Sequence, residues 1–396
     1  MLRSRGLVNN IHNQENVKNI KSTNVQISEP NRRAVLGEIG NKVNTKRGTA
    51  LIEKSDAFLK DKKSVSKSQN IKLIEKPVQV VKPVAKEGPP IESKSHNPTV
   101  VKKDIESFST ELLPIEDIDE DDRHNPSLVS IYINDIFKHL RSLEAEYPIN
   151  KSYLTGQEIT PNMRSILIDW LVDVHQQFRL IQETLYLTVA IIDRFLQTYR
   201  IIDRKRLQLV GVTATFIASK YEEMCIPEIS DFVYITDNAY SKDEILQMEI
   251  LILRALNFSF GRPLPLHFLR RYSKAGKALS IHHTMAKYFL EQSLISYELC
   301  HYPPSLIAAA ALYLAFAVHA AENDETEIWT KTLVHYSTYS KEDVLPIVHK
   351  IATIIIKSDK CKYQAVRKKY VQPKFMKVSL RPELKSPIML AFAQTS

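Results

Sequence analysis

The fold class is decided by the stretch TPNMRSILIDWLVDVHQQF, which runs from Thr160 to Phe178. It opens with a helix start signal, because Thr160 can accept a hydrogen bond from a free backbone N–H group and Pro161 fits the first turn. Apolar residues then recur at three- and four-residue steps, apart from one adjacent pair: Ile166, Trp170, Leu171, Val174 and Phe178. This spacing predicts an amphipathic α-helix.

Comparable patterns on both sides of this stretch predict further helices. Their approximate ranges are 127–143, 183–197, 205–222, 241–256, 267–274, 281–299, 304–320 and 341–356. The range that begins at Ser241 has Glu244 three residues later, which is the capping-box pattern of a helix start. Pro263 and Pro265 then interrupt the helical pattern. Because strand patterns are weak, the sequence predicts an all-α fold.

Two of these ranges resemble each other at an offset of 97 residues. The matching residues are small, namely Gly211, Thr213, Ala214 and Ala218 in the first range and Ala308, Ala310, Ala311 and Ala315 in the second. A helix that is surrounded by others must be slim, so that its neighbours' backbones can approach. Alanine-rich helices also look alike by chance, but we favour two similar helical domains joined near 261–265.

Charge is distributed unevenly along the 396 residues, whose formal net charge is +9. Residues 1–103 hold 21 Lys and Arg against 9 Asp and Glu, whereas 104–122 hold nine acids and no Lys or Arg. Residues 1–107 contain one aromatic residue, Phe58. Such a segment cannot bury enough apolar surface to offset its ordering entropy, so we predict a disordered tail followed by an acidic linker.

Composition excludes several classes of protein. The cysteines at 225, 300 and 361 are far apart, which argues against a disulfide framework or a cysteine zinc site and indicates a reducing, intracellular environment. The longest apolar run has 13 residues, fewer than the ~18 of a membrane-spanning helix. No secretory signal opens the chain, and the nine glycines form no nucleotide-binding motif.

A set of motifs within the helical region resembles the cyclin family. Met163–Val172 resembles the signature helix of the cyclin box, and further matching segments are 182–185 (QETL), 192–195 (IDRF), 207–211 (LQLVG) and 218–223 (ASKYEE). The runs LRALNF (253–258) and GRPLPLHFLRR (261–271) are similar to those of B-type mitotic cyclins. The motifs stand in family order and spacing over approximately residues 105–380.

The resemblance implies a fold and a domain organisation. The fold is two tandem five-helix cyclin folds, preceded by a disordered N-terminal tail and a short N-terminal helix. The implied domains are a regulatory tail (1–107), an acidic linker (108–126), the N-terminal helix with the first cyclin box (127–262), and the second cyclin box (263–385).

The resemblance also implies a function without catalysis. The chain would bind and activate a mitotic cyclin-dependent kinase as its regulatory subunit, recruit substrates, and be degraded through ubiquitin to permit mitotic exit. The sequence itself agrees with a non-catalytic role, because it shows no cluster of catalytic residues. The adjacent His282 and His283 point about 100° apart on a helix and cannot share a metal ion by themselves. We therefore expect no enzymatic activity, no cofactor and no metal.

By resemblance, Lys220 and Glu249 organise the surface that contacts the kinase. Opposite charges on two helices can pair with each other or with a partner's backbone, so an internal salt bridge is the alternative. The surrounding apolar contacts are assigned to Phe216, Tyr221, Ile245 and Ile252, and to Tyr132, Ile136 and Phe137 of the N-terminal helix.

A substrate-docking patch is a second candidate site. Four apolar residues lie at i, i+3, i+4 and i+7 on one helix face: Met163, Ile166, Leu167 and Trp170. Read alone, such a stripe is more often core. The resemblance instead implies an exposed patch, completed by Gln208, for short Arg-x-Leu motifs. Asp169 and Asp173 nearby would favour a basic ligand.

A phosphate site is a third candidate. Arg270, His283 and Lys287 resemble the positions that form an anion pocket in B-type cyclins. His283 and Lys287 are an i, i+4 pair and so share one helix face, and Arg can grip phosphate oxygens bidentately. This pocket would bind phosphorylated partners. The alternative is a scattered, solvated basic face.

Two motifs lie outside the helical region. The first, R-x-x-L-x-x-I-x-N, resembles the destruction box that the anaphase-promoting ubiquitin ligase reads, and consists of Arg33, Leu36, Ile39 and Asn41. The second resembles a nuclear-export segment that an export receptor would bind, and consists of Phe108, Leu112, Leu113, Ile115 and Ile118. The alternative for the second is a linker that packs on the cyclin box. We expect shuttling between cytoplasm and nucleus, with a nuclear location in mitosis.

Two other classes of function stay open. A cyclin-fold transcription factor that binds DNA is suggested by the pI of about 9.1 and by the basic clusters Arg204–Arg206 and Arg367–Lys369. Specific DNA binding would depend steeply on salt, and we expect only weak non-specific binding by the tail. A helical scaffold without a kinase is the other class. We expect neither specific nucleic acid nor membrane as a partner.

Overall fold

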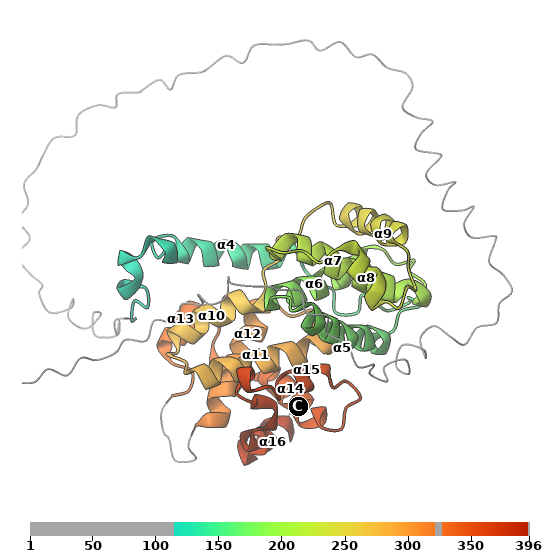
Figure 1. Cartoon of the computed structure of the whole chain (residues 1–396). Coiled ribbons are helices and arrows are strands. Elements are labelled where there is room, and N and C mark those ends of the chain that lie inside the picture. Colours follow the sequence, from blue (N-terminus) through green and yellow to red (C-terminus); the bar gives the residue numbers. More distant parts are fainter. Residues whose placement is uncertain (1–114, 321–326, 395–396) are drawn as a thin grey trace, which may run out of the picture. The chain divides into compact units, whose positions relative to one another are not determined.

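The structure is a computed structural model that describes residues 115–320 and 327–394, in which all regular structure is helical (Figure 1). The all-α prediction is therefore confirmed. The predicted tail, the destruction box (Arg33, Leu36, Ile39 and Asn41) and three residues of the export segment, Phe108, Leu112 and Leu113, lie outside the described residues. The described residues all belong to one compact unit of the chain.

The first group of helices is built around α7. It comprises α5 (Pro161–Phe178), α6 (Gln182–Thr198), α7 (Leu207–Glu222), α8 (Ile229–Ile235) and α9 (Lys242–Ala255). Helix α7 packs against all four others and is buried from Leu209 to Ser219. Its small residues permit this: a Cβ atom added at Gly211 would lie 2.7 Å from Cδ1 of Leu167, closer than two carbon atoms can come without one of them moving.

The second group repeats the arrangement around α12. It comprises α10 (Pro265–Ala275), α11 (Ser280–Ile295), α12 (Pro304–His319), α13 (Lys331–Ser337), α14 (Lys341–Ser358), α15 (Ala365–Lys369) and α16 (Pro387–Gln394). Helix α12 packs against α10, α11, α13, α14 and α16, and its run of four alanines is fully buried. The predicted pair of slim central helices is therefore correct.

A buried arginine of the first group, paired with an aspartate, links the two groups. Helix α5 packs against α11 and α15 of the second group. From α5, the guanidinium of Arg164 donates to both carboxylate oxygens of Asp193 in α6, at 2.6 and 2.7 Å. Its remaining nitrogen donates to the backbone carbonyl of Leu294 in α11, at 3.0 Å. Because the side chains of Arg164 and Asp193 are almost wholly buried, this arrangement fixes one group against the other.

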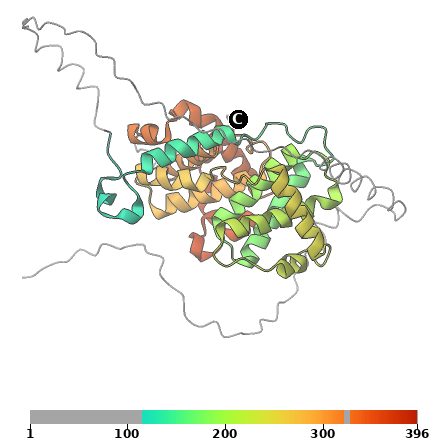
Figure 2. The same cartoon turned by 90° about the horizontal axis from the view of Figure 1, so that it is seen from above.

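Helix α4 (Ile133–Glu146) precedes both groups and lies along the second one (Figures 1 and 2). Phe137 packs edge-on against Phe268 of α10, and Arg141 donates to the backbone carbonyl of Ser337 in α13 at 2.6 Å. The predicted start at residue 127 was wrong. Val129 adopts a left-handed conformation with φ of 54°, which separates a short 3₁₀ turn from the helix.

Short elements complete the described chain. The 3₁₀ turns are η1 (Glu120–His124), η2 (Pro126–Leu128), η3 (Arg204–Arg206), η4 (Pro373–Phe375), η5 (Val378–Leu380) and η6 (Pro382–Lys385). Helix α16 packs against α14 beyond the predicted end of the second box at residue 385, and the ring nitrogen Nδ1 of His349 lies 2.8 Å from the Phe392 carbonyl. Among the described residues, no helix is long and apolar enough to cross a membrane.

Candidate protein-binding surfaces

The Lys220–Glu249 pair joins the C-terminal end of α7 to the middle of α9. The ammonium nitrogen of Lys220 lies 2.7 Å from a carboxylate oxygen of Glu249 and 4.0 Å from the centroid of the Phe216 ring. The Lys220 side chain is 42% exposed, whereas that of Glu249 is 11% exposed. Glu249 and the Phe216 ring therefore hold an ammonium group that still has room to donate outward. The structure thus has the internal salt bridge and leaves the contact role available.

Three of the apolar residues predicted around this pair are core residues. Phe216 is buried and packs on Phe232 of α8, with the ring centroids 5.1 Å apart. Ile245 and Ile252 are fully buried, because the face of α9 that carries Glu249 is the face that packs on α7. The prediction that these three side chains form an outer surface was wrong, while Tyr221 is exposed as expected.

The exposed apolar side chains near the pair lie on the face of α9 that adjoins Glu249, and just after the helix. Leu246 and Ile250 are exposed at an i, i+4 spacing, and Phe258 is exposed in the following turn. Sequence reasoning missed them because α9 is apolar on two faces. The i, i+4 repeat of Leu246 and Ile250 was the signal that could have identified the outer face.

Helix α4 presents a second apolar surface. Tyr132 at its N-cap has 62% of its surface exposed, Ile136 is exposed on the next turn, and Ile131 just before the helix is more exposed still. Phe137 points the other way, into the contact with Phe268. Two of the three α4 residues predicted to face the kinase are therefore accessible to a partner.

The predicted docking stripe on α5 is only partly exposed. Met163, Ile166 and Trp170 are half-buried, as is Gln208 on α7. Leu167 is buried against Gly211, so its inclusion in an exposed patch was wrong. The reason is geometric. When one side of a helix packs on its neighbours, a stripe of four residues extends partly onto that packed side, and Leu167 lies there.

Asp169 lies beside this stripe but points toward the second group of helices. Its carboxylate accepts a hydrogen bond of 2.9 Å from the backbone N–H of Ala365 at the start of α15. Burial raises the pKa of Asp169 from 3.8 to about 6, against the lowering effect of that hydrogen bond. A half-buried carboxylate that is held by the chain's own backbone is a poor docking group for a basic ligand.

Asp169→Asn should stabilise the protein at neutral pH. The raised pKa means that folding favours the protonated form, so the ionised carboxylate costs stability fully above pH 6 and not at all below 3.8. Asparagine keeps the acceptor oxygen without the charge, and we expect a gain of about 1–3 kcal/mol at pH 7.5. Urea unfolding at pH 7.5 and pH 4 measures the difference, which should shrink on acidification. Asp121→Asn, on an exposed side chain, is the control; an equal effect there would contradict the assignment.

The three predicted phosphate ligands lie close enough to affect one another. Burial and the charges of Lys287 and Arg270 lower the pKa of His283 to about 4, so its ring is neutral at physiological pH. The Nδ1 atom of that ring lies 2.8 Å from the Ser273 hydroxyl. Arg270 is already paired with Glu183. The cluster therefore holds two cations, one of which a phosphate would have to share with a carboxylate.

The two described residues of the export segment differ: one fits an export signal, and the other fits a linker that packs on the helical core. Ile115 is exposed, as a receptor would require. Ile118 is half-buried against the core, and its backbone N–H donates to the Tyr336 hydroxyl at 3.3 Å. Packing on the cyclin box is thus the correct interpretation for Ile118.

The described residues give little support to DNA binding. In the cluster Arg367–Lys369, Lys369 is buried against Glu291 at 2.8 Å, and Arg367 is paired with Asp359. This cluster is therefore not a basic face, whereas Arg204–Arg206 is exposed.

No group of three or more metal-ligating side chains was found within 115–320 and 327–394.

Comparison with known proteins identifies both groups of helices. A family model described as the cyclin N-terminal domain matches residues 135–261, and one described as the cyclin C-terminal domain matches residues 263–384. Two consecutive cyclin domains define the class of the protein, which is a cyclin.

Curated relatives narrow this class. A G2/mitotic-specific cyclin-B from Patella vulgata is 48% identical over 91% of this chain and 90% of its own length. Another from Spisula solidissima is 55% identical over 74% of this chain and 67% of its own. The chain therefore belongs to the cyclin family, within its B-type, G2/mitotic-specific members. Among solved structures, a viral cyclin from herpesvirus saimiri is 23% identical over 55% of this chain and 97% of its own, with a TM-score of 0.49.

Proposed function

We propose that the chain is the non-catalytic regulatory subunit of a mitotic cyclin-dependent kinase. The observation that carries this proposal is the half-exposed Lys220–Glu249 pair, with exposed apolar side chains beside it at Tyr221, Leu246 and Ile250. A fixed cation within an apolar surface suits a partner helix that offers both apolar side chains and free backbone carbonyls.

Activation follows from preferential binding. A kinase that exchanges between inactive and active arrangements shifts toward the arrangement that the cyclin binds more tightly. The cyclin then contributes surface, and the kinase contributes the chemistry.

The first test is a pull-down with the full chain from mitotic lysate, followed by mass spectrometry and a histone-phosphorylation assay. Co-purification of an active kinase is expected, and a helical scaffold without a kinase would bring down no such activity.

We further propose that the half-buried residues Met163, Ile166 and Trp170, with Gln208, dock substrates that carry Arg-x-Leu motifs. The support is the strip of half-buried apolar side chains that these residues form along α5, which the leucine of such a motif could cover.

Trp170→Ala should weaken binding of an Arg-x-Leu peptide at least tenfold, because the large aromatic anchor of the strip is removed. Isothermal titration with a synthetic peptide measures the change. Leu279→Ala, which removes an exposed apolar side chain in the second box, is the matched control and should bind normally. Equal affinity of the Trp170 variant would exclude the strip.

The other interactions implied by the resemblance stay proposals of the same kind. We propose that the anaphase-promoting ubiquitin ligase reads the motif at Arg33 and Leu36, and that phosphorylated partners bind at Arg270 and Lys287 by displacing Glu183. Export through the segment that ends at Ile118, and nuclear accumulation in mitosis, are proposed on the same basis. Any receptor that reads Ile118 must first free it from Tyr336.

A further inference from the structure

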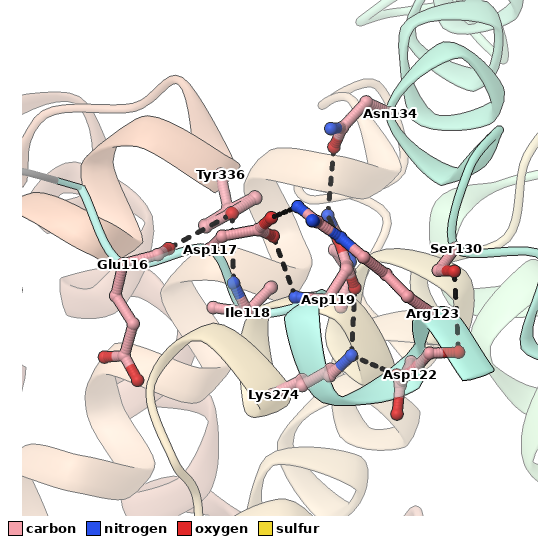
Figure 3. A network of polar contacts seen from close by, with 11 residues as sticks. Glu116, Asp117, Ile118, Asp119, Asp122, Arg123, Ser130, Asn134, Lys274 and Tyr336 are labelled. Carbon is pink, nitrogen blue, oxygen red and sulfur yellow. Dashed lines mark hydrogen bonds and ion pairs between the residues drawn. The ribbon is translucent and has the colours of Figure 1, made fainter. Parts of the chain in front are cut away.

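The acidic linker is bound to α10 by a polar network that also reaches α4 (Figure 3). At its centre, Arg271 of α10 donates to both carboxylate oxygens of Asp119, at 2.5 and 2.6 Å. Lys274 donates to Asp119 at 2.9 Å and is also paired with Asp122. The Arg271 and Asp119 side chains are only 5% and 9% exposed, so this is a buried ion pair rather than a surface contact.

The same arginine holds the first half of α4. Its Nη2 atom also donates to the side-chain oxygen of Asn134 at 3.0 Å, and its guanidinium carbon lies 5.6 Å from the centroid of the Phe137 ring. On the other side it lies 4.7 Å from the centroid of the Tyr336 ring. Arg271 therefore links the linker, α4 and α13 in one place.

Such polar tethers supplement the packing of α4, because none of its residues is fully buried and only Phe137 and Leu140 pack against the core. Its second half is held by Arg141, which bonds α13, and by Glu144, which accepts from the backbone and hydroxyl of Ser305. Its first half, which carries the exposed Tyr132 and Ile136, is the part that Arg271 reaches.

We propose that the Asp119–Arg271 pair is a tether by which the linker positions α4 and thereby prepares its Tyr132–Ile136 surface for the kinase. The proposal rests on the proposed function and deepens it. Asp119 neutralises an arginine that would otherwise be a buried, unpaired charge, and only a neutralised Arg271 can remain between the linker and Asn134. The pKa of Asp119 is lowered accordingly, since hydrogen bonds from Arg271 and Lys274 outweigh burial.

Asp119→Asn in the full chain tests the tether. The variant keeps the size of the side chain and removes its charge. We expect hydrogen exchange of α4 amides to rise at least tenfold while α7 amides keep their protection, and the Kd for the kinase to rise about tenfold, because a smaller share of molecules presents α4 correctly. Asp121→Asn makes the same change on an exposed side chain of the same turn and should alter neither quantity.

A second variant guards against general unfolding. Asn134→Ala leaves the Asp119–Arg271 pair in place and removes its bond to α4, so α4 exchange should rise and kinase affinity should fall about threefold. Unchanged α4 exchange in Asp119→Asn, or faster exchange with unchanged kinase affinity, would overturn the proposal. Equal effects of Asp121→Asn would also overturn it. If the wild-type chain bound no kinase, the proposed function would fail, and the exchange data alone would decide whether the tether exists.

Discussion

Replacing Lys220 and Glu249 together by alanine should release the kinase while the chain stays folded. The Lys220 side chain is 42% exposed, and removing both charges together leaves no buried ion without a partner. Its contribution to stability is then at most about 1 kcal/mol. The loss of a positioned cation beside apolar contacts should lower kinase affinity about a hundredfold, which is roughly 3 kcal/mol.

Surface plasmon resonance with the full chain measures this affinity, and circular dichroism monitors the fold. The matched control is Arg381→Ala with Glu383→Ala, which removes a partly exposed ion pair of the second box at 3.2 Å. The control should bind the kinase normally. Undiminished kinase binding by the folded Lys220 and Glu249 variant would remove the surface on which the proposed function depends.

The largest effect on stability is expected from Asp193→Asn. The carboxylate of Asp193 neutralises Arg164 and accepts a hydrogen bond of 2.7 Å from Tyr153, all within the core. The variant would leave a buried guanidinium without a counter-ion, which costs about 3–5 kcal/mol. Chemical denaturation measured by tryptophan fluorescence gives the change in free energy of unfolding.

A chemically identical change at the surface provides the comparison. Asp117 is paired with Arg123 at 2.5 Å, but both side chains are largely exposed, so Asp117→Asn should cost less than about 1 kcal/mol. Similar losses in the two variants would show that burial of the Arg164–Asp193 pair does not govern its importance.

The arrangement of helices was predictable because it depends on patterns that the sequence carries locally. Ser241 and Glu244 do form a capping box, and Thr160 does accept from the N–H of Met163. The slim central helices were visible as small residues in register. The short helices α8, α13, α15 and α16 were missed, because five to eight residues are too few to establish a periodicity.

The orientation of side chains at the candidate sites was less predictable. A position such as Leu167 or Ile245 is apolar whether its face packs on a neighbour or on a partner, and only the packed structure decides. The direction of Asp169 depends on Ala365, which lies 196 residues away in the sequence. Likewise, the linker's role in holding α4 depends on Arg271, 152 residues after Asp119, and no local pattern links the two.

The docking of α4 on the second box has a consequence for synthesis. The ribosome makes Asn134 137 residues before Arg271, and makes Arg141 196 residues before Ser337. At roughly 5–20 residues per second, the helix waits on the order of ten seconds before its binding partners emerge. During that interval Phe137 and Tyr132 are both uncovered on the nascent chain. Helix α4 is thus synthesised early but packs late. During this interval its apolar side chains are accessible to chaperones.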